Sequence, residues 1–220
     1  MRSRTIAQWL MESEFIVSIY EGRWLRRSRL INLLQRVSFE DEYNLVVGSL
    51  NLDENSVVVD VACGTGIYAR SIGRGLPSTI VVGIDISIPM LTHAINLKQR
   101  EQLTNVHYVR ADGHALPFPS RLVDAVVCCG ALHLFQDAEA VLREIERVLK
   151  PGGSLAIATF RRRSGSFSAK ATALRHRITG MAAYLPDELE SILHRLGFSN
   201  IDRHHAKGIW MISSAVKIAH

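Results

Sequence analysis

Residues 57–66 form an apolar run that leads through an acidic residue into a glycine turn. Gly64 and Gly66 are separated by one residue, and glycine allows both a sharp turn and the close approach of a ligand to the backbone. A helix is predicted from Ile67, and its first N–H groups would face whatever lies at the turn. Since open α/β sheets bind ligands at the carboxyl ends of their strands, the segment predicts a binding loop for a nucleotide-like cofactor.

The glycine loop alone is compatible with two kinds of cofactor. The stretch from Gly64 to Ala69 fits the pattern G-x-G-x-x-A, and Asp85 follows about twenty residues later, as in dinucleotide-binding proteins. The carboxylate of Asp85 could accept hydrogen bonds from the ribose hydroxyls of a dinucleotide or of a nucleoside cofactor. A nicotinamide dinucleotide and an adenosyl compound therefore both remain candidates at this point.

Acidic residues elsewhere favour a cofactor that carries positive charge. Asp60 precedes Gly64 by four positions, where a negative charge would disfavour a pyrophosphate but suit an amino group and a sulfonium. Asp112 and Gly113 follow a third predicted strand, and an aspartate there can accept a hydrogen bond from the exocyclic amine of adenine. Cys129 and Gly130 follow a fourth predicted strand. Four consecutive strand ends would then contact one small ligand.

These positions depend on an alternation of strands and helices. Strands are predicted at residues 56–61, 79–84, 106–110, 123–128 and 154–160, and helices at 67–75, 89–102 and 138–149, with a turn at 150–153. A helix at 186–196 precedes two strands, 200–205 and 209–216, that fit an antiparallel hairpin at the sheet edge. We expect an α/β, Rossmann-like, doubly wound and mostly parallel sheet with helices on both faces.

The bulk composition fits one globular domain with an appendage. The chain has 220 residues, of which 47% are hydrophobic. We divide it into a helical N-terminal extension, residues 1–50, that caps the substrate, and a cofactor-binding domain, residues 51–220. The longest uncharged apolar run, 125–136, is too short to span a membrane. Glu12 and Glu14 interrupt any signal-peptide core, so we expect a cytoplasmic location.

Charge and cysteine content exclude some functions. The formal net charge is +5, and arginines cluster at 161–163 in a basic stretch, 161–184, of unassigned structure. These arginines form either a solvated surface or a receiver for an acidic substrate. No nucleic-acid module accompanies them, so nucleic acid is not expected as a partner. The three cysteines lack metal-ligand spacing, which favours small apolar fillers and predicts no metal site.

The full set of motifs resembles the class I S-adenosylmethionine-dependent methyltransferases, in particular the ubiquinone/menaquinone-biosynthesis-like small-molecule subgroup. The resemblance covers residues 40–160 well and 185–216 loosely. Ala62 departs from it, because many relatives carry glycine there, although alanine is small enough to fit. The resemblance implies a seven-stranded, mostly parallel sheet with one antiparallel strand near the edge. The segments that carry it are residues 57–66, 82–87, 111–113 with 116–118, 124–133 and 142–153.

The resemblance also implies a role for each residue of the S-adenosyl-L-methionine site. Asp60, Gly64 and Gly66 would hold the methionine portion, and Asp85 the ribose hydroxyls. The adenine would lie against Ile86 and the edge formed by Asp112 and Gly113, while backbone groups of Cys129 and Gly130 would face the methionine amine. The other residues assigned to the cofactor are Ala62, Cys63 and Met90.

Each assignment has a structural alternative. Asp60 could cap the next helix, Asp85 and the Asp112–Gly113 pair could be turn residues, and Ile86 could belong to the core. A dinucleotide would instead make the protein an NAD-dependent oxidoreductase. A third alternative is a protein that binds the cofactor without transferring methyl, as a regulator or an aid to a rearrangement.

The predicted reaction is in-line methyl transfer to a carbon, nitrogen or oxygen of a small-molecule acceptor. His133 is the candidate base, because histidine titrates near neutral pH and this one follows the fourth strand; a structural role is the alternative. Aromatic residues of the N-terminal segment could line an apolar acceptor pocket or simply pack helices together. An acidic acceptor and a homodimer are left open. The aromatic residues concerned are Tyr20, Trp24, Phe39 and Tyr43.

Overall fold

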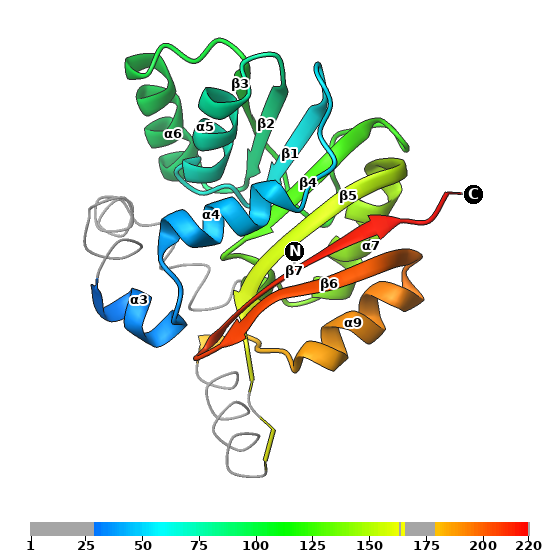
Figure 1. The fold of residues 1–220 in the computed structure, drawn as a ribbon. Helices are drawn as coiled ribbons and strands as arrows, with labels where there is room; N and C mark the ends of the chain where they lie inside the picture. Colours follow the sequence, from blue (N-terminus) through cyan, green and yellow to red (C-terminus); the bar gives the residue numbers. More distant parts are fainter. Residues whose placement is uncertain (1–28, 163, 166–178, 220) are drawn as a thin grey trace.

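The computed structural model describes residues 29–162, 164–165 and 179–219 (Figure 1). Tyr20, Trp24 and Arg163, together with most of the basic stretch 161–184, lie outside these residues. Within them, none of the helices is long and apolar enough to cross a membrane.

The described residues form one seven-stranded sheet in the order β3-β2-β1-β4-β5-β7-β6 (Figure 1). All neighbouring pairs are parallel except those of β7, which runs antiparallel to both β5 and β6. The predicted fold class and the hairpin at the sheet edge are therefore confirmed. The strands are β1 (Val57–Val61), β2 (Ile80–Asp85), β3 (Val106–Arg110), β4 (Val123–Cys129), β5 (Leu149–Phe160), β6 (Phe198–Lys207) and β7 (Trp210–Lys217).

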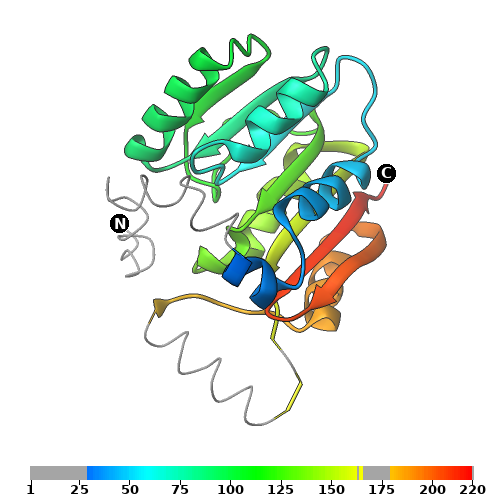
Figure 2. The same ribbon diagram turned by 60° about the vertical axis from the view of Figure 1, so that its left-hand side comes forward.

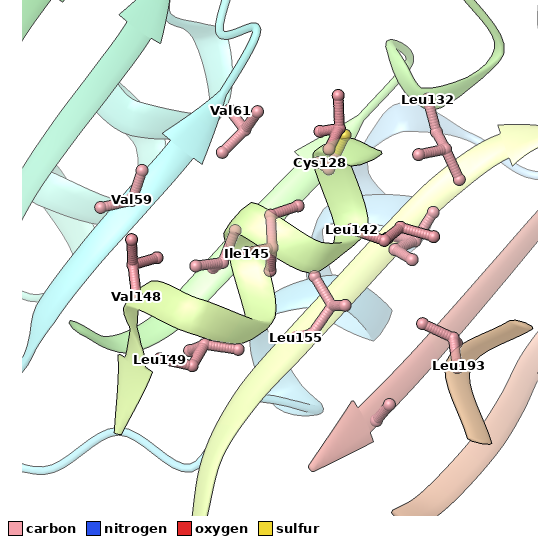
Figure 3. Close-up of a cluster of buried hydrophobic side chains, with 14 of the residues drawn as sticks. Val59, Val61, Cys128, Leu132, Leu142, Ile145, Val148, Leu149, Leu155 and Leu193 are labelled. Carbon is pink, nitrogen blue, oxygen red and sulfur yellow. The ribbon is translucent and has the colours of Figure 1, made fainter. Parts of the chain in front are cut away.

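Helices cover both faces of this sheet. One face packs its apolar side chains against α7 and α9, and Figure 3 shows Leu142, Ile145 and Val148 of α7 lying over β1, β4 and β5. The opposite face packs against α4 and α5, and Figure 2 shows α3 and α4 on that side, near β7. The helices are α3 (Arg29–Gln35), α4 (Phe39–Gly48), α5 (Ile67–Gly75), α6 (Ile88–Arg100), the short 3-10 helix η1 (Leu132–Leu134), α7 (Ala138–Val148) and α9 (Pro186–Arg195).

The predicted turn at residues 150–153 is wrong. Strand β5 begins at Leu149, which pairs with Val123, and after a register shift Ser154 pairs with Ala125. Residues 150–153 are therefore an irregularity inside the strand. A Cβ on Gly153 would lie 2.9 Å from the carbonyl oxygen of Lys150, so glycine permits this local crowding where the sequence pattern alone indicates a turn.

Helix α3, the first helix of the described residues, contacts the hairpin formed by β6 and β7. The N–H of Ile209 donates to the carbonyl oxygen of Leu34 at 3.1 Å, and Nε2 of His205 lies 2.9 Å from the carbonyl oxygen of Gln35. These contacts satisfy carbonyl groups at the C-terminal end of α3, which have no partner inside the helix. They place the start of the described chain against the antiparallel edge of the sheet.

Candidate functional site

The glycine loop between β1 and α5 is closed by backbone hydrogen bonds. The N–H of Gly66 donates to the carbonyl of Cys63, and the N–H of Cys63 donates to the carbonyl of Ile84 in β2, both at 2.9 Å. Gly64 and Gly66 have φ values of 56° and 75°, in the left-handed region that glycine tolerates. The two glycines thus form the predicted turn at the carboxyl end of β1.

Ala62 also adopts a left-handed conformation, with φ at 54°. Such a conformation costs a residue with a Cβ about 1–2 kcal/mol. The alanine nevertheless fits, because its side chain packs against the apolar cluster under α7. A glycine at this position would adopt the same conformation without that cost.

Asp60 lies on β1 and is almost fully buried, at 2% exposure. Its Oδ2 accepts a hydrogen bond from the N–H of Ala69, in the first turn of α5, at 3.1 Å. This bond satisfies one of the helix N–H groups that lack an internal partner, so the helix-capping role considered for Asp60 exists. The bond also fixes a buried carboxylate directly beneath the glycine loop.

Asp85 is the last residue of β2 and joins two loops. Its Oδ2 accepts from the N–H of Gly64 and its Oδ1 from the N–H of Ser87, each at 2.8 Å. The next residue, Ile86, is 47% exposed, so it is not a core residue as considered above. Met90 in α6 is buried at 3% exposure and lies behind this edge. An oriented carboxylate and an exposed apolar side chain therefore lie side by side at the end of β2.

Tyr108 of β3 is part of the support of the glycine loop and was not singled out from the sequence. Gly83 on β2 pairs with both Asp60 and Tyr108. A Cβ on Gly83 would lie 2.7 Å from the Tyr108 ring, and one on Gly66 would lie 2.1 Å from its hydroxyl. The ring thus lies over Gly83 and reaches beneath Gly66. Burial raises the pKa of Tyr108, and its hydroxyl has no hydrogen-bond partner among the described residues.

The loop after β3 carries Asp112, Gly113 and a histidine that the sequence reasoning passed over. Oδ1 of Asp112 lies 2.7 Å from Nδ1 of His114 and accepts the His114 backbone N–H at 3.0 Å. A Cβ on Gly113 would lie 3.1 Å from the ring of Phe135. The loop is therefore packed closely against the segment that follows β4. The D-x-H spacing is the sequence signal that could have identified His114.

The end of β4 places the remaining predicted residues. Cys129 is buried at the last position of the strand, and the N–H of Gly130 donates to the carbonyl of Ala158 at 2.8 Å. His133 in η1 is 5% exposed. Its Nδ1 lies 3.2 Å from Oγ1 of Thr159, and its ring centroid is 4.1 Å from that of Phe160. His133 thus lies at the expected strand end, packed in an aromatic cluster.

Two of the thiols near this edge, those of Cys63 and Cys128, are held in their neutral form. Burial, reinforced by the negative charges of Asp60 and Asp85, raises the pKa of Cys63 well above its usual value. Burial also raises the pKa of Cys128 to about 12. A thiolate is the nucleophilic form of cysteine, so these buried residues act as apolar fillers.

Two other groups from the sequence reasoning have structural partners. Phe39 and Tyr43 pack against Tyr68 of α5, with ring centroids 5.6 and 6.2 Å from it, as expected for helix packing. They also line an open cavity of about 380 Å³ between α3, α4 and α5.

Among the arginines, Arg162 forms an ion pair with Glu188 at 3.2 Å, and Nη1 of Arg161 donates to the carbonyl of Gly208 at 3.3 Å.

Comparison with known proteins assigns the central part of the chain to a family. Residues 59–157, which include the glycine loop, Asp85, Asp112 and His133, match the family model described as a methyltransferase domain. This segment is a methyltransferase domain. The predicted resemblance to S-adenosylmethionine-dependent methyltransferases is therefore confirmed.

Curated relatives of this methyltransferase domain carry methyltransferase names. The chain is 28% identical over 207 residues to an uncharacterised chloroplastic methyltransferase of Arabidopsis thaliana, covering 90% of this chain and 57% of that protein. It is 39% identical over 103 residues to a demethylmenaquinone methyltransferase of Thermus thermophilus, covering 47% of this chain and 46% of that protein. The chain thus spans about half the length of these relatives.

A solved structure shares the fold of almost the whole chain. Phosphoethanolamine N-methyltransferase 2 of Haemonchus contortus, in complex with phosphomonomethylethanolamine and S-adenosylhomocysteine, superposes with a TM-score of 0.80. The likeness covers 98% of this chain and 61% of that one at 16% identity, so it establishes the fold alone. The match to the methyltransferase family model supports S-adenosyl-L-methionine as the cofactor of the domain.

Proposed function

We propose that this protein transfers the methyl group of S-adenosyl-L-methionine to a small-molecule acceptor. The observation that carries the proposal is the hydrogen bond from the N–H of Gly64 to Asp85. It brings the glycine turn of β1 and the acidic end of β2 to one edge of the sheet. That edge is where open α/β sheets bind ligands.

The residues present fit an adenosyl cofactor. Ile86 offers an exposed apolar side chain to an adenine ring, and the side chain of Asp112, 51% exposed, offers an acceptor to its amine. Asp85 is oriented for the ribose hydroxyls, while Asp60, Gly64 and Gly66 surround the place proposed for the methionine portion. The methionine amine donates hydrogen bonds, so the backbone groups of Cys129 and Gly130 that could receive it are carbonyl oxygens, whereas the N–H of Gly130 donates to the carbonyl of Ala158.

The cofactor would supply an activated methyl group, whose S–CH₃ bond would break with the electron pair passing to sulfur as the acceptor nucleophile bonds to the carbon. The protein orients the two partners in line and excludes water. His133, at the end of β4, is the residue we propose to take the proton that an acceptor hydroxyl, amine or acidic carbon loses. Its contact with Thr159 fixes the orientation of the ring.

The acceptor is proposed to be a small molecule bound beneath the N-terminal segment, residues 1–50. The names of the relatives, among them demethylmenaquinone methyltransferases, support this class of acceptor. Helices α3 and α4 belong to that segment and lie against the antiparallel edge and α5. A covering element in this position would shield the transferring methyl group from water.

The test is the formation of S-adenosylhomocysteine by the purified full chain. The protein would be incubated with methyl-labelled S-adenosylmethionine and a panel of quinol, phenol, amine and carboxylic acid acceptors. Acceptor-dependent release of S-adenosylhomocysteine supports the proposal. Tight cofactor binding without turnover on any acceptor would favour a non-catalytic binding protein. The second candidate is a dinucleotide cofactor, because the glycine pattern followed by Asp85 is also typical of dinucleotide-binding proteins. A titration with NAD tests this alternative.

A further inference from the structure

The contact between Asp112 and His114 lies beside the proposed adenine position and has no part in the function described so far. Oδ1 of Asp112 accepts from the backbone N–H of His114 and lies 2.7 Å from its ring Nδ1. A carboxylate only accepts hydrogen bonds, so Nδ1 must carry the proton. The imidazole therefore holds one defined tautomer and fixes the carboxylate from one side.

The surroundings of the imidazole prevent it from turning away. The His114 ring meets the ring of Phe135 edge-on, with centroids 5.5 Å apart and an interplanar angle of 89°. Phe135 in turn fills the space beside Gly113, at 3.1 Å from the position of a Cβ there. The histidine side chain is 15% exposed, and its Nε2 is buried without a hydrogen-bond partner among the described residues. Contacts at Nδ1 and at the ring thus define its orientation.

We infer that His114 is a positioning residue that orients the Asp112 carboxylate to receive the exocyclic amine of the cofactor's adenine. The aspartate lies in a loop and its side chain is half exposed, so each hydrogen-bond donor that it meets narrows the set of rotamers that it adopts. The imidazole restricts the rotamers of the Asp112 side chain. Phe135, in the segment after β4, packs against the imidazole and so keeps it in place. This inference rests on the proposed function, because it assumes an adenosyl cofactor at this edge.

The test compares two ligands of which only one carries the amine at position 6 of the purine, the other having a carbonyl oxygen there and a proton on N1. The dissociation constants of S-adenosylhomocysteine and of S-inosylhomocysteine, which lacks the 6-amino group, are measured by calorimetry on the full chain. His114→Ala is expected to raise the dissociation constant of S-adenosylhomocysteine roughly tenfold, as for a lost hydrogen bond to a charged group. The dissociation constant of the inosyl analogue is expected to stay unchanged. His114→Asn, whose side-chain amide can donate near the position of Nδ1, restores the preference for adenine.

The control is His107→Ala, which removes an exposed histidine of β3 and leaves both constants unchanged. Equal weakening of both ligands by His114→Ala would show a merely structural role and overturn the inference. An unchanged preference for adenine would overturn it as well. If the parent protein bound no S-adenosylhomocysteine, the proposed function itself would fail and this inference with it.

Discussion

Asp85 and Gly64 are joined by a hydrogen bond of 2.8 Å between the carboxylate of one and the backbone N–H of the other. The bond spans two adjacent parallel strand ends, and the second oxygen of Asp85 accepts from Ser87 at the start of α6. One side chain therefore sets the shape of the glycine loop and is itself held in place.

We expect Asp85→Asn to weaken cofactor binding. The amide has only one acceptor oxygen for two N–H donors, so one of these bonds is lost, and a ribose hydroxyl loses a charged acceptor. The affinity for S-adenosylhomocysteine should fall at least about tenfold, with a loss of about 1–2 kcal/mol in the free energy of unfolding. Calorimetry and urea unfolding measure the two effects. Asp202→Asn, at an exposed position of β6, is the control, and an unaltered affinity in Asp85→Asn would contradict the assignment.

The role of His133 as the base can be tested by measuring cofactor binding and turnover separately. His133→Asn removes a group that can take a proton but keeps a polar side chain near Thr159. If His133 is the base, kcat falls by about 10²-fold or more while the dissociation constant of S-adenosylhomocysteine is unchanged. Kinetics with the accepted substrate provide the measurement. A variant that loses thermal stability but keeps its kcat would show that the aromatic packing around His133 is its whole role.

Two tyrosines, of which Tyr68 is buried and Tyr108 partly buried, provide a comparison for stability. The Tyr108 hydroxyl has no partner among the described residues, whereas the Tyr68 hydroxyl donates to the buried carboxylate of Glu42 in α4. Tyr108→Phe should leave the free energy of unfolding unchanged or raise it by about 1 kcal/mol, while Tyr68→Phe should lower it by about 1–3 kcal/mol. Urea unfolding of both variants checks the difference. The reverse order would mean that Tyr108 has a polar partner in solution.

An acidic residue of α7 makes stability depend on pH. The hydrogen bond and charge of Arg147 lower the pKa of Glu144 from its usual 4.5, and its Oε2 also accepts from the N–H of Leu116 at 2.8 Å. Because the folded-state pKa is depressed, this stabilisation is present above the unfolded-state pKa and is lost as the pH falls through the folded-state value. The difference in unfolding free energy between the parent and Glu144→Gln should therefore be largest at neutral pH and shrink below pH 4.5.

A difference that stayed constant from pH 7 to pH 3 would show that Glu144 stabilises the fold without its charge. Glu54→Gln is the matched control. Glu54 is exposed in the turn before β1, and its removal should leave the pH profile of the parent unchanged.

The sequence predicts the fold well because its elements are local and strongly patterned. The helix at 67–75 and the strand at 106–110 have the same bounds in the structure, and the order of strand ends follows from parallel topology. The error at residues 150–153 arose because the pairing of Leu149 with Val123 is non-local. Proline and glycine signal a turn in the sequence, and only the neighbouring strand shows that the chain stays in the sheet.

The candidate site is less predictable where residues act through space. Asp60, Asp85 and Asp112 could be found from their places at or just beyond the carboxyl ends of strands. Tyr108 could not, because its importance comes from the missing side chains of Gly66 and Gly83 on other elements. The burial of His133 against Phe160 and Trp210 likewise depends on β5 and β7. The position of a residue at the end of a strand predicts whether its side chain can reach the site. The packing of side chains from neighbouring strands decides how that side chain is oriented.

Calorimetric titration of the purified full chain with S-adenosylhomocysteine and, separately, with NAD examines the central claim most directly. We predict saturable one-to-one binding of S-adenosylhomocysteine that Asp85→Asn weakens, and no saturation by NAD. The central claim would be contradicted if NAD saturated the protein while S-adenosylhomocysteine and S-adenosylmethionine showed no binding at millimolar concentrations.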